Sequence, residues 1–225
     1  MSFSTEWEER YAANTHLSVW PWSDVVSLVH RHCKPVISAG GGRVLELGCG
    51  AGANIPLFCA LNIDYYAVEG SPTIVRQLHE RYPDRVKNIV CSDFTMDQPF
   101  AAGFDLVVDR AALTHNNTAS IKNALQIAFD ALAPGGTFIG VDWFSTNYSD
   151  FSMGDTVDDA FTKTNIATGS FSGVGKVHFS DETHLRDLFS QFEIIFLEEK
   201  LTRRLEPPDQ HQFASWNIVA RKPNV

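Results

Sequence analysis

A glycine-rich loop with a carboxylate beside it is the part of this sequence best suited to bind a ligand. The run Val44-Leu-Glu-Leu-Gly-Cys-Gly-Ala-Gly-Ala-Asn54 contains three closely spaced glycines and one acidic residue, Glu46. Glycines let a backbone approach a ligand closely, and the free N–H groups of a following helix can bind it. The spacing Gly48-x-Gly50-x-x-Ala53 also satisfies a dinucleotide fingerprint, and a tight turn without any ligand can have the same composition.

The acidic residues near this loop indicate which kind of ligand it would take. Glu69 ends a second apolar run, where a carboxylate can accept hydrogen bonds from two ribose hydroxyls. Ser92-Asp93-Phe94 follows a third run and combines polar groups with an aromatic face suited to an adenine ring. With Glu46 and Asp109, these carboxylates disfavour a pyrophosphate and favour a ligand that carries a sulfonium and an ammonium group.

The chain around these residues alternates short apolar runs with helical patterns. Runs rich in β-branched and aromatic residues predict parallel strands over residues 43–48, 63–69, 86–91, 104–109 and 137–143. Pro72 suits the first turn of one intervening helix. Another helix is predicted between an N-cap at Thr118 and the breaker Pro134-Gly135-Gly136. Its apolar residues share one helical face: Ile121, Ala124, Leu125, Ala128 and Leu132.

The last quarter of the chain changes character. Residues 192–201 and 213–221 are strand-like, and too few residues separate them for a crossover helix, so they should pair antiparallel. The predicted fold is α/β: a Rossmann-like, seven-stranded, mainly parallel sheet with an antiparallel C-terminal hairpin and helices on both faces. We expect one domain with four parts: a helical lid (1–35), a ligand-binding core (36–143), a cap insertion (144–178), and a C-terminal helix and strand pair (179–225). The length of the cap suggests that it covers a site.

Five features taken together resemble the class I S-adenosylmethionine-dependent methyltransferases. They are the glycine loop, the acidic end of the second strand, Asp93-Phe94, Phe104-Asp-Leu-Val-Val-Asp109 and Leu132-Ala-Pro-Gly-Gly136. The resemblance covers residues 40–145 by motif and the whole chain by strand order. It implies S-adenosyl-L-methionine as the cofactor and methyl transfer to a small-molecule acceptor, by O- or N-methylation.

The resemblance also implies roles for individual residues. Glu69 would bind the ribose, Asp93 would bind the adenine amino group, and Phe94 would pack on the base, although Phe94 is equally suited to the core. Glu46, Gly48 and Gly50 would surround the methionine part. The segment Trp7-Glu-Glu-Arg-Tyr11 is similar to a lid, in which Arg10 or Tyr11 would reach the methionine carboxylate. The other expected cofactor neighbours are Cys49, Gly52, Asn54, Gly70, Ser71 and Asp109.

Histidine is the side chain that best suits a general base, which a hydroxyl acceptor requires. His115 lies just past the fourth strand, where the resemblance places the acceptor, and is the first candidate; His178 and His16 follow. An amine acceptor that is already neutral would need no base, and His115 would then serve only the start of the following helix. The other residues expected around the acceptor are Asp109, Arg110, Trp143 and Phe144.

The composition argues against several classes of partner. With 27 acidic and 18 basic residues, the net charge of −9 disfavours nucleic acid and anionic membranes as partners. The four cysteines form no C-x-x-C pair, and the sequence lacks a signal peptide and a transmembrane run, so we expect a cytoplasmic protein with reduced thiols. The pair His30-x-His32 would point to different faces of a helix, so we expect no metal.

Two other functions remain possible at this stage. A nicotinamide-dependent oxidoreductase is disfavoured, because no tyrosine in the chain is followed four residues later by a lysine. A protein that binds the cofactor without catalysis fits the same residues. The sequence does not indicate the oligomeric state.

Overall fold

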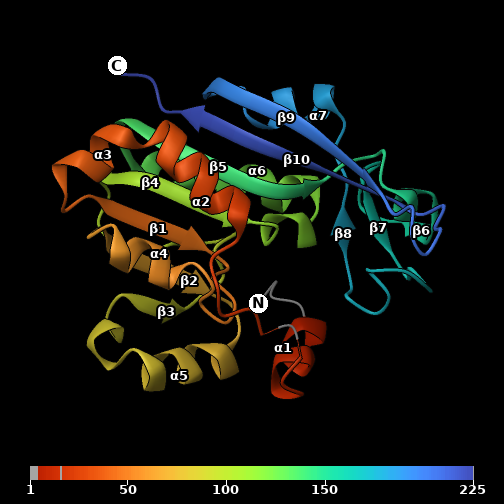
Figure 1. Ribbon diagram of the computed structural model, residues 1–225, viewed down its shortest axis with the longest axis horizontal. Helices are drawn as coiled ribbons and strands as arrows, with labels where there is room; N and C mark the ends of the chain where they lie inside the picture. The colour runs from red at the N-terminus through yellow and green to blue at the C-terminus, as the bar shows by residue number, and fades with distance from the viewer. Residues whose placement is uncertain (1–4, 16, 225) are drawn as a thin grey trace.

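The computed structural model describes residues 5–15 and 17–224. Seven strands form one sheet in the order β3-β2-β1-β4-β5-β10-β9 (Figure 1). The strands from β3 to β5 pair in parallel, and β10 pairs antiparallel with both β5 and β9. This confirms the predicted mainly parallel sheet with an antiparallel C-terminal hairpin. The bounds are β1 Arg43–Leu47, β2 Asp64–Glu69, β3 Ile89–Cys91, β4 Phe104–Arg110, β5 Leu132–Phe144, β9 Glu193–Arg203 and β10 Gln212–Arg221.

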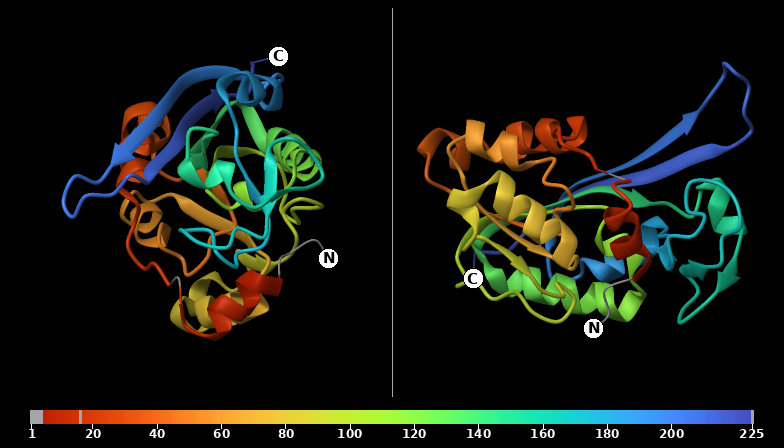
Figure 2. Two further views of the ribbon diagram at one scale, coloured as in Figure 1. Left: turned by 90° about the vertical axis from the view of Figure 1, so that its right-hand side faces the viewer. Right: turned by 90° about the horizontal axis from the view of Figure 1, so that it is seen from below.

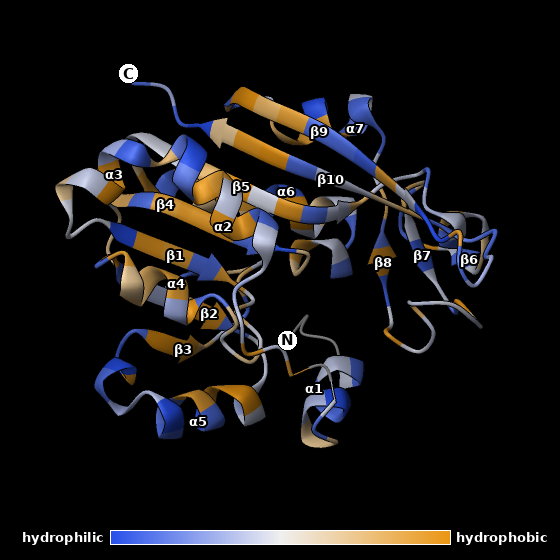
Figure 3. Ribbon diagram, viewed as in Figure 1, coloured by the Kyte–Doolittle hydropathy of each residue, from blue (hydrophilic) through white to orange (hydrophobic). Residues whose placement is uncertain are grey.

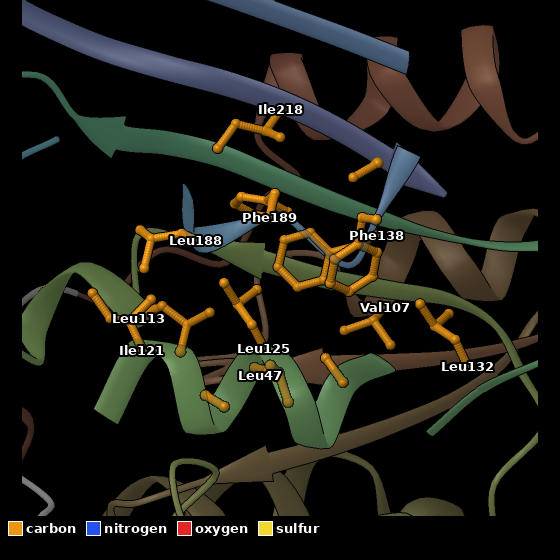
Figure 4. Close-up of a cluster of buried hydrophobic side chains, with 14 of the residues drawn as sticks. Leu47, Val107, Leu113, Ile121, Leu125, Leu132, Phe138, Leu188, Phe189 and Ile218 are labelled. Carbon is orange, nitrogen blue, oxygen red and sulfur yellow. The ribbon is translucent and has the colours of Figure 1, made fainter. Parts of the chain in front are cut away.

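Helices cover both faces of the sheet. One face packs against α6 (Thr118–Ala131) and α7 (Glu182–Leu188), and Figure 4 shows the apolar side chains between α6 and the strands. The other face packs against α2 (Ser23–His32), α3 (Lys34–Ala39), α4 (Ile55–Ala60) and α5 (Pro72–Arg81). The central strands are hydrophobic along much of their length because both of their faces are buried (Figure 3). Among the described residues, no helix is long and apolar enough to span a membrane.

Local chemistry corrects several predicted boundaries. The N-cap of α6 is Asn117, whose side chain accepts a hydrogen bond from the Ser120 N–H, and Thr118 is the first helical residue. This helix ends at Ala131, and Pro134-Gly135-Gly136 lies within the long strand β5. The third strand is shorter than predicted, because a 3-10 turn over Pro83–Arg85 precedes it.

The cap insertion carries regular structure that the sequence analysis missed. A 3-10 turn, Ser149–Ser152, precedes three short antiparallel strands: β6 (Asp155–Thr156), β7 (Thr162–Thr164) and β8 (Val177–His178). The cap encloses its own apolar cluster, which includes Tyr148, Ile166, Phe171, Val174, Val177 and Phe179. It lies beyond the carboxyl ends of the parallel strands, and the β9–β10 hairpin projects beside it (Figure 2).

A buried pair of histidines joins this cap to the core. His178 of β8 is 1% exposed, and its Nε2 lies 3.1 Å from the Nε2 of His184 in α7. Its Nδ1 lies 3.1 Å from the Thr162 hydroxyl. Burial, and then the neighbouring His184, lowers the pKa of His178 from 6.5 to about 3. Because one of the two facing nitrogens must accept a hydrogen bond, the arrangement requires at least one neutral imidazole.

We expect acid to destabilise the folded protein through His178. Its pKa is lower in the folded chain than in the unfolded chain, so its contribution is complete above pH 6.5 and is lost as the pH falls toward 3. Relative to His178→Gln, the wild type should lose about 2–3 kcal/mol of unfolding free energy between pH 6.5 and pH 4.5, measured by urea titration. Val177 is a buried neighbour that does not titrate, so Val177→Ala should lower the unfolding free energy by the same amount at both pH values. A pH-independent difference between wild type and His178→Gln would contradict this prediction.

Candidate functional site

A cavity of about 640 Å³ lies at the carboxyl ends of the parallel strands. This is the edge where β2 and β4 lie on opposite sides of β1, the point at which open α/β sheets bind ligands. The volume falls within the range of about 300–1,000 Å³ typical of small-molecule sites. The predicted site residues that line the cavity are Tyr11, Glu46, Gly48, Cys49, Gly50, Asn54, Glu69, Gly70, Asp93, Phe94, Arg110, His115 and Phe144.

The glycine loop after β1 is held by the carboxylate at the end of β2. Glu69 is buried, and its two oxygens accept hydrogen bonds from the N–H groups of Gly50 at 2.8 Å and Ser71 at 2.9 Å. Burial raises the pKa of Glu69, and these two hydrogen bonds oppose that shift. Gly48 has a φ of 65°, and a Cβ there would lie 2.3 Å from the Cβ of Ala112. The loop therefore packs directly against the turn after β4, where only glycine fits.

Glu46 lies at the base of the cavity within a hydrogen-bonded group. Its carboxylate accepts hydrogen bonds from the Asn54 amide at 2.7 Å and from the Tyr65 hydroxyl at 2.5 Å. The backbone N–H of Trp22 in turn donates to Asn54 Oδ1 at 3.3 Å. Burial raises the pKa of Glu46 to about 7, against the effect of its two donors. A cation bound beside this carboxylate would favour its charged form.

Asp93 and Phe94 form the side of the cavity after β3. One oxygen of Asp93 accepts hydrogen bonds from the Thr95 N–H at 2.9 Å and from the Thr95 hydroxyl at 2.7 Å. Phe94 is 8% exposed: its ring packs in the core cluster against α6 and also lines the cavity. Both expectations for Phe94, a core residue and a ligand neighbour, are therefore compatible with its position.

Asp109 requires a correction, because it does not line the cavity. Its side chain is fully buried, and it accepts hydrogen bonds from the N–H groups of Ala112 and Leu113 and from the Trp143 indole at 2.6 Å. Burial raises its pKa to about 7. The two backbone hydrogen bonds close a turn that contains Ala111, a non-glycine residue with a φ of 56°. Asp109 thus stabilises a strained turn that positions the residues after it, and its side chain does not reach the cavity.

His115 follows this turn and lines the cavity. Its Nδ1 lies 3.1 Å from the Lys176 carbonyl oxygen, and its ring meets Trp7 edge-on at 4.8 Å between centroids. Burial lowers the pKa of His115 to about 4, so the imidazole is neutral at pH 7. A carbonyl oxygen can only accept, so Nδ1 carries the proton and Nε2 keeps a lone pair. The ring is therefore prepared to accept a proton at Nε2.

A charged network on the far side of the cavity was not predicted. Arg110 forms an ion pair with Asp142 at 3.0 Å, and its guanidinium lies 3.7 Å from the centre of the Trp22 ring. Lys200 of β9 forms ion pairs with Asp142 at 3.1 Å and with Asp24. The sequence analysis placed one of these residues, Arg110, near the acceptor. The others come from α2, β5 and the C-terminal hairpin, and no motif connects them.

Other predicted residues lie away from the cavity. Arg10 donates to the Ser172 carbonyl oxygen at 2.7 Å and so connects α1 (Thr5–Ala12) to the cap. Gly52 lies where a Cβ would meet Leu78 at 2.7 Å, so its role is helix packing. The remaining three are Ser71, the N-cap of α5; Trp143, which is fully buried; and His178, in the pair described above. His16 lies outside the described residues, and among those residues no cluster of three metal-ligating side chains occurs.

A family model for the methyltransferase domain matches residues 44–136, from β1 into β5. Over these residues the chain matches the methyltransferase-domain family, and its fold is that of solved S-adenosylmethionine-dependent methyltransferases. Protein-L-isoaspartate O-methyltransferase of Azoarcus sp. (strain BH72) is 33% identical over 110 residues, which are 46% of this chain and 47% of that protein. The match therefore spans about half the length of that relative.

Solved structures of methyltransferases share the fold. A S-adenosylmethionine-dependent methyltransferase of Methanosarcina mazei superposes with a TM-score of 0.65 at 17% identity, over 81% of this chain and 93% of that one. The 1,6-didemethyltoxoflavin-N1-methyltransferase of Burkholderia thailandensis superposes with a TM-score of 0.66 at 17% identity, over 97% of this chain and 84% of that one. The latter structure contains bound 1,6-didemethyltoxoflavin and S-adenosylhomocysteine.

S-adenosylmethionine is the cofactor of this family, and the residues around the glycine loop fit it. The cavity wall there carries the carboxylates of Glu46, Glu69 and Asp93, and among the described residues that line this part none is basic. A Cβ on Gly50 would lie 3.2 Å from the Tyr11 hydroxyl, so glycine keeps space between the loop and α1. An acidic, open cradle of this kind suits a cationic ligand with ribose hydroxyls.

Proposed function

We propose that this protein transfers a methyl group from S-adenosylmethionine to a small-molecule acceptor, by O- or N-methylation. The observation that carries the proposal is a single cavity with two chemically different halves. The half at the glycine loop is acidic, and the half beyond His115 is aromatic with a balanced charged network. Such a cavity can hold a cationic cofactor and an acceptor side by side, as in-line displacement requires.

The residues at the glycine loop would bind the cofactor. Glu69 has lone pairs beyond the two that bind Gly50 and Ser71, and these would accept the ribose hydroxyls. Asp93 would bind the adenine amino group, and Phe94 would pack on the base. Glu46 and the loop glycines would surround the methionine part, together with Tyr11 of α1. When bound, the cofactor supplies a sulfonium methyl group for transfer.

Enclosure of the cavity favours a small acceptor. Trp7 and Tyr11 of α1 line one side of it, and the cap and the C-terminal hairpin line the other. The net charge of −9 disfavours nucleic acid as the acceptor. The 1,6-didemethyltoxoflavin-N1-methyltransferase, whose fold this chain shares, has 1,6-didemethyltoxoflavin bound, which supports an acceptor of this size.

Calorimetry tests the cofactor assignment against a nicotinamide dinucleotide. A saturating concentration of S-adenosylhomocysteine, about one thousand times its dissociation constant, should add about 4 kcal/mol to the unfolding free energy. NAD at the same concentration should add nothing measurable. Methyl transfer is then sought with S-adenosylmethionine and pooled small molecules, with mass spectrometry of the products. Stabilisation by NAD alone would overturn the assignment, and cofactor binding without any methylated product would favour a non-catalytic binding protein.

We further propose that α1 acts as a lid over the cofactor. Its Glu8 carboxylate accepts hydrogen bonds from the Ser71 and Thr73 hydroxyls at the start of α5. Arg10 connects the same helix to the cap. Trp7 packs against the cap cluster and Tyr11 against the core, but no side chain of α1 is fully buried, so these polar contacts are a substantial part of what holds the helix across the cavity.

Weakening this attachment should speed cofactor release. Glu8→Gln loses the charge of an acceptor that serves two hydroxyls, which is worth about 1–2 kcal/mol at a partly exposed site. The dissociation rate of S-adenosylhomocysteine, followed by stopped-flow tryptophan fluorescence, should rise about five- to thirtyfold. Glu9→Gln, on the exposed side of the same helix, is the matched control and should leave the rate unchanged. Equal rates in both variants would count against a lid.

A further inference from the structure

The half of the cavity beyond His115 has a wall of aromatic rings. Phe144 ends β5, Tyr148 and Phe171 belong to the cap, and Phe213 belongs to β10; all four line the cavity. Ring centroids lie 4.4 Å apart for Phe144 and Phe171, 4.9 Å for Tyr148 and Phe171, and 5.5 Å for Tyr148 and Phe213. The four rings therefore form one continuous surface.

Part of this surface belongs to the apolar cluster of the cap. Tyr148 and Phe171 are members of that cluster that reach the cavity, whereas Ile166, Val177 and Phe179 do not line it. Phe213 is 37% exposed at the cavity edge, on the hairpin that projects from the body of the protein (Figure 2). An apolar ligand that covered this ring would remove that surface from water, which is favourable.

The polar part of this compartment carries a balanced network of ion pairs. Arg110, Lys200 and Asp142 line the cavity, and Asp24, which does not line it, forms a second ion pair with Lys200. Hydroxyl groups of Thr202 and Ser215 also line the cavity. A ligand with a net charge would leave one member of this network without its counterion, whereas a neutral ligand with hydrogen-bonding groups would not.

On the basis of the proposed methyl transfer, we propose that the acceptor is a neutral, planar aromatic or heteroaromatic molecule with a hydroxyl or ring N–H group. Its apolar surface packs against the wall of Phe144, Tyr148, Phe171 and Phe213. Its polar edge faces the balanced network, and the group to be methylated lies toward His115, where wall and network meet the acidic half of the cavity. Aromatic contacts of this kind contribute beyond the burial of area, so planarity itself is recognised.

Three probes on the same bicyclic ten-carbon skeleton separate planarity from charge. Isothermal titration of the full chain, saturated with S-adenosylhomocysteine, uses 2-naphthol, trans-decahydro-2-naphthol and 6-hydroxynaphthalene-2-sulfonate. We expect 2-naphthol to bind at least tenfold more tightly than the saturated alcohol, and more tightly than the sulfonate. Equal or tighter binding of the saturated alcohol or of the sulfonate, or no detectable binding of 2-naphthol, overturns the inference.

Two variants on the same hairpin assign the preference to the wall. Phe213→Ala should weaken 2-naphthol binding about three- to tenfold, because one ring contact is lost. Leu205→Ala removes an exposed apolar side chain outside the cavity and should leave the affinity unchanged. Unchanged affinity in Phe213→Ala overturns the role of the wall. The wild type's affinity for S-adenosylhomocysteine is measured first: its absence refutes the proposed function, whereas normal cofactor binding without probe preference refutes only the acceptor class.

Discussion

Replacing Glu69 with alanine should lower the affinity for S-adenosylhomocysteine at least tenfold. The carboxylate is expected to accept two ribose hydroxyls, and it also holds the glycine loop through the N–H groups of Gly50 and Ser71. Hydrogen bonds to a charged group are worth about 1.5–3 kcal/mol each, so the loss of even one ribose contact accounts for a tenfold effect. Alanine also leaves two N–H donors at the loop without their acceptor, so the cofactor would meet a less ordered cradle.

Three measurements separate these contributions. Isothermal titration gives the affinity of Glu69→Ala, and urea titration shows how much of the folded state survives. Glu69→Gln keeps the shape and one acceptor oxygen, so its affinity should fall between those of wild type and Glu69→Ala. Glu80→Ala removes the same charge from the exposed surface of α5 and should bind as the wild type does. Wild-type affinity in a folded Glu69→Ala protein would refute the ribose role.

The fold was largely predictable because its signals are local. The central parallel strands are apolar runs buried on both faces, and the short C-terminal connection leaves only an antiparallel pairing. One error arose where two neighbouring side chains can both fill the same structural position, the N-cap of a helix. Asn117 and Thr118 can both cap a helix, and the structure uses Asn117. The short strands β6 to β8 have two or three residues each, too few for a periodic pattern to indicate them.

The site was predictable only where strand ends bring motifs together. Glu46, Glu69 and Asp93 lie at or just beyond the carboxyl ends of three parallel strands, so the topology places them at one edge of the sheet. Lys200 and Phe213 reach the same cavity from a hairpin more than 100 residues away, and no spacing in the sequence connects them with the glycine loop. Asp109 was misassigned because a carboxylate at the end of a strand is typical of a ligand contact. In the structure it is buried beneath the following turn and accepts hydrogen bonds from that turn's backbone N–H groups.

For an acceptor with a hydroxyl group, His115→Ala should lower kcat by about a hundredfold. A general base contributes about 10²–10⁴-fold to the rate. Burial lowers the pKa of His115 to about 4, which makes its imidazole a weak proton acceptor. We therefore expect an effect at the lower end of that range. The same low pKa keeps the base form populated across the neutral range. Because this pKa lies below its ordinary value of 6.5, kcat should stay constant as the pH falls from 8 to about 5 and decline only as it approaches 4.

Two control variants distinguish a base from a structural contact. His115→Asn can still donate to the Lys176 carbonyl oxygen but offers no basic nitrogen, so it should be as slow as His115→Ala if Nε2 accepts the proton. Recovery of the wild-type rate in His115→Asn would assign His115 to positioning the turn. Asn116→Ala changes the adjacent cavity residue without removing a base, and its kcat should remain within tenfold of the wild type. A loss of less than tenfold in His115→Ala, with cofactor affinity unchanged, would mean that the acceptor gives up its proton without this histidine.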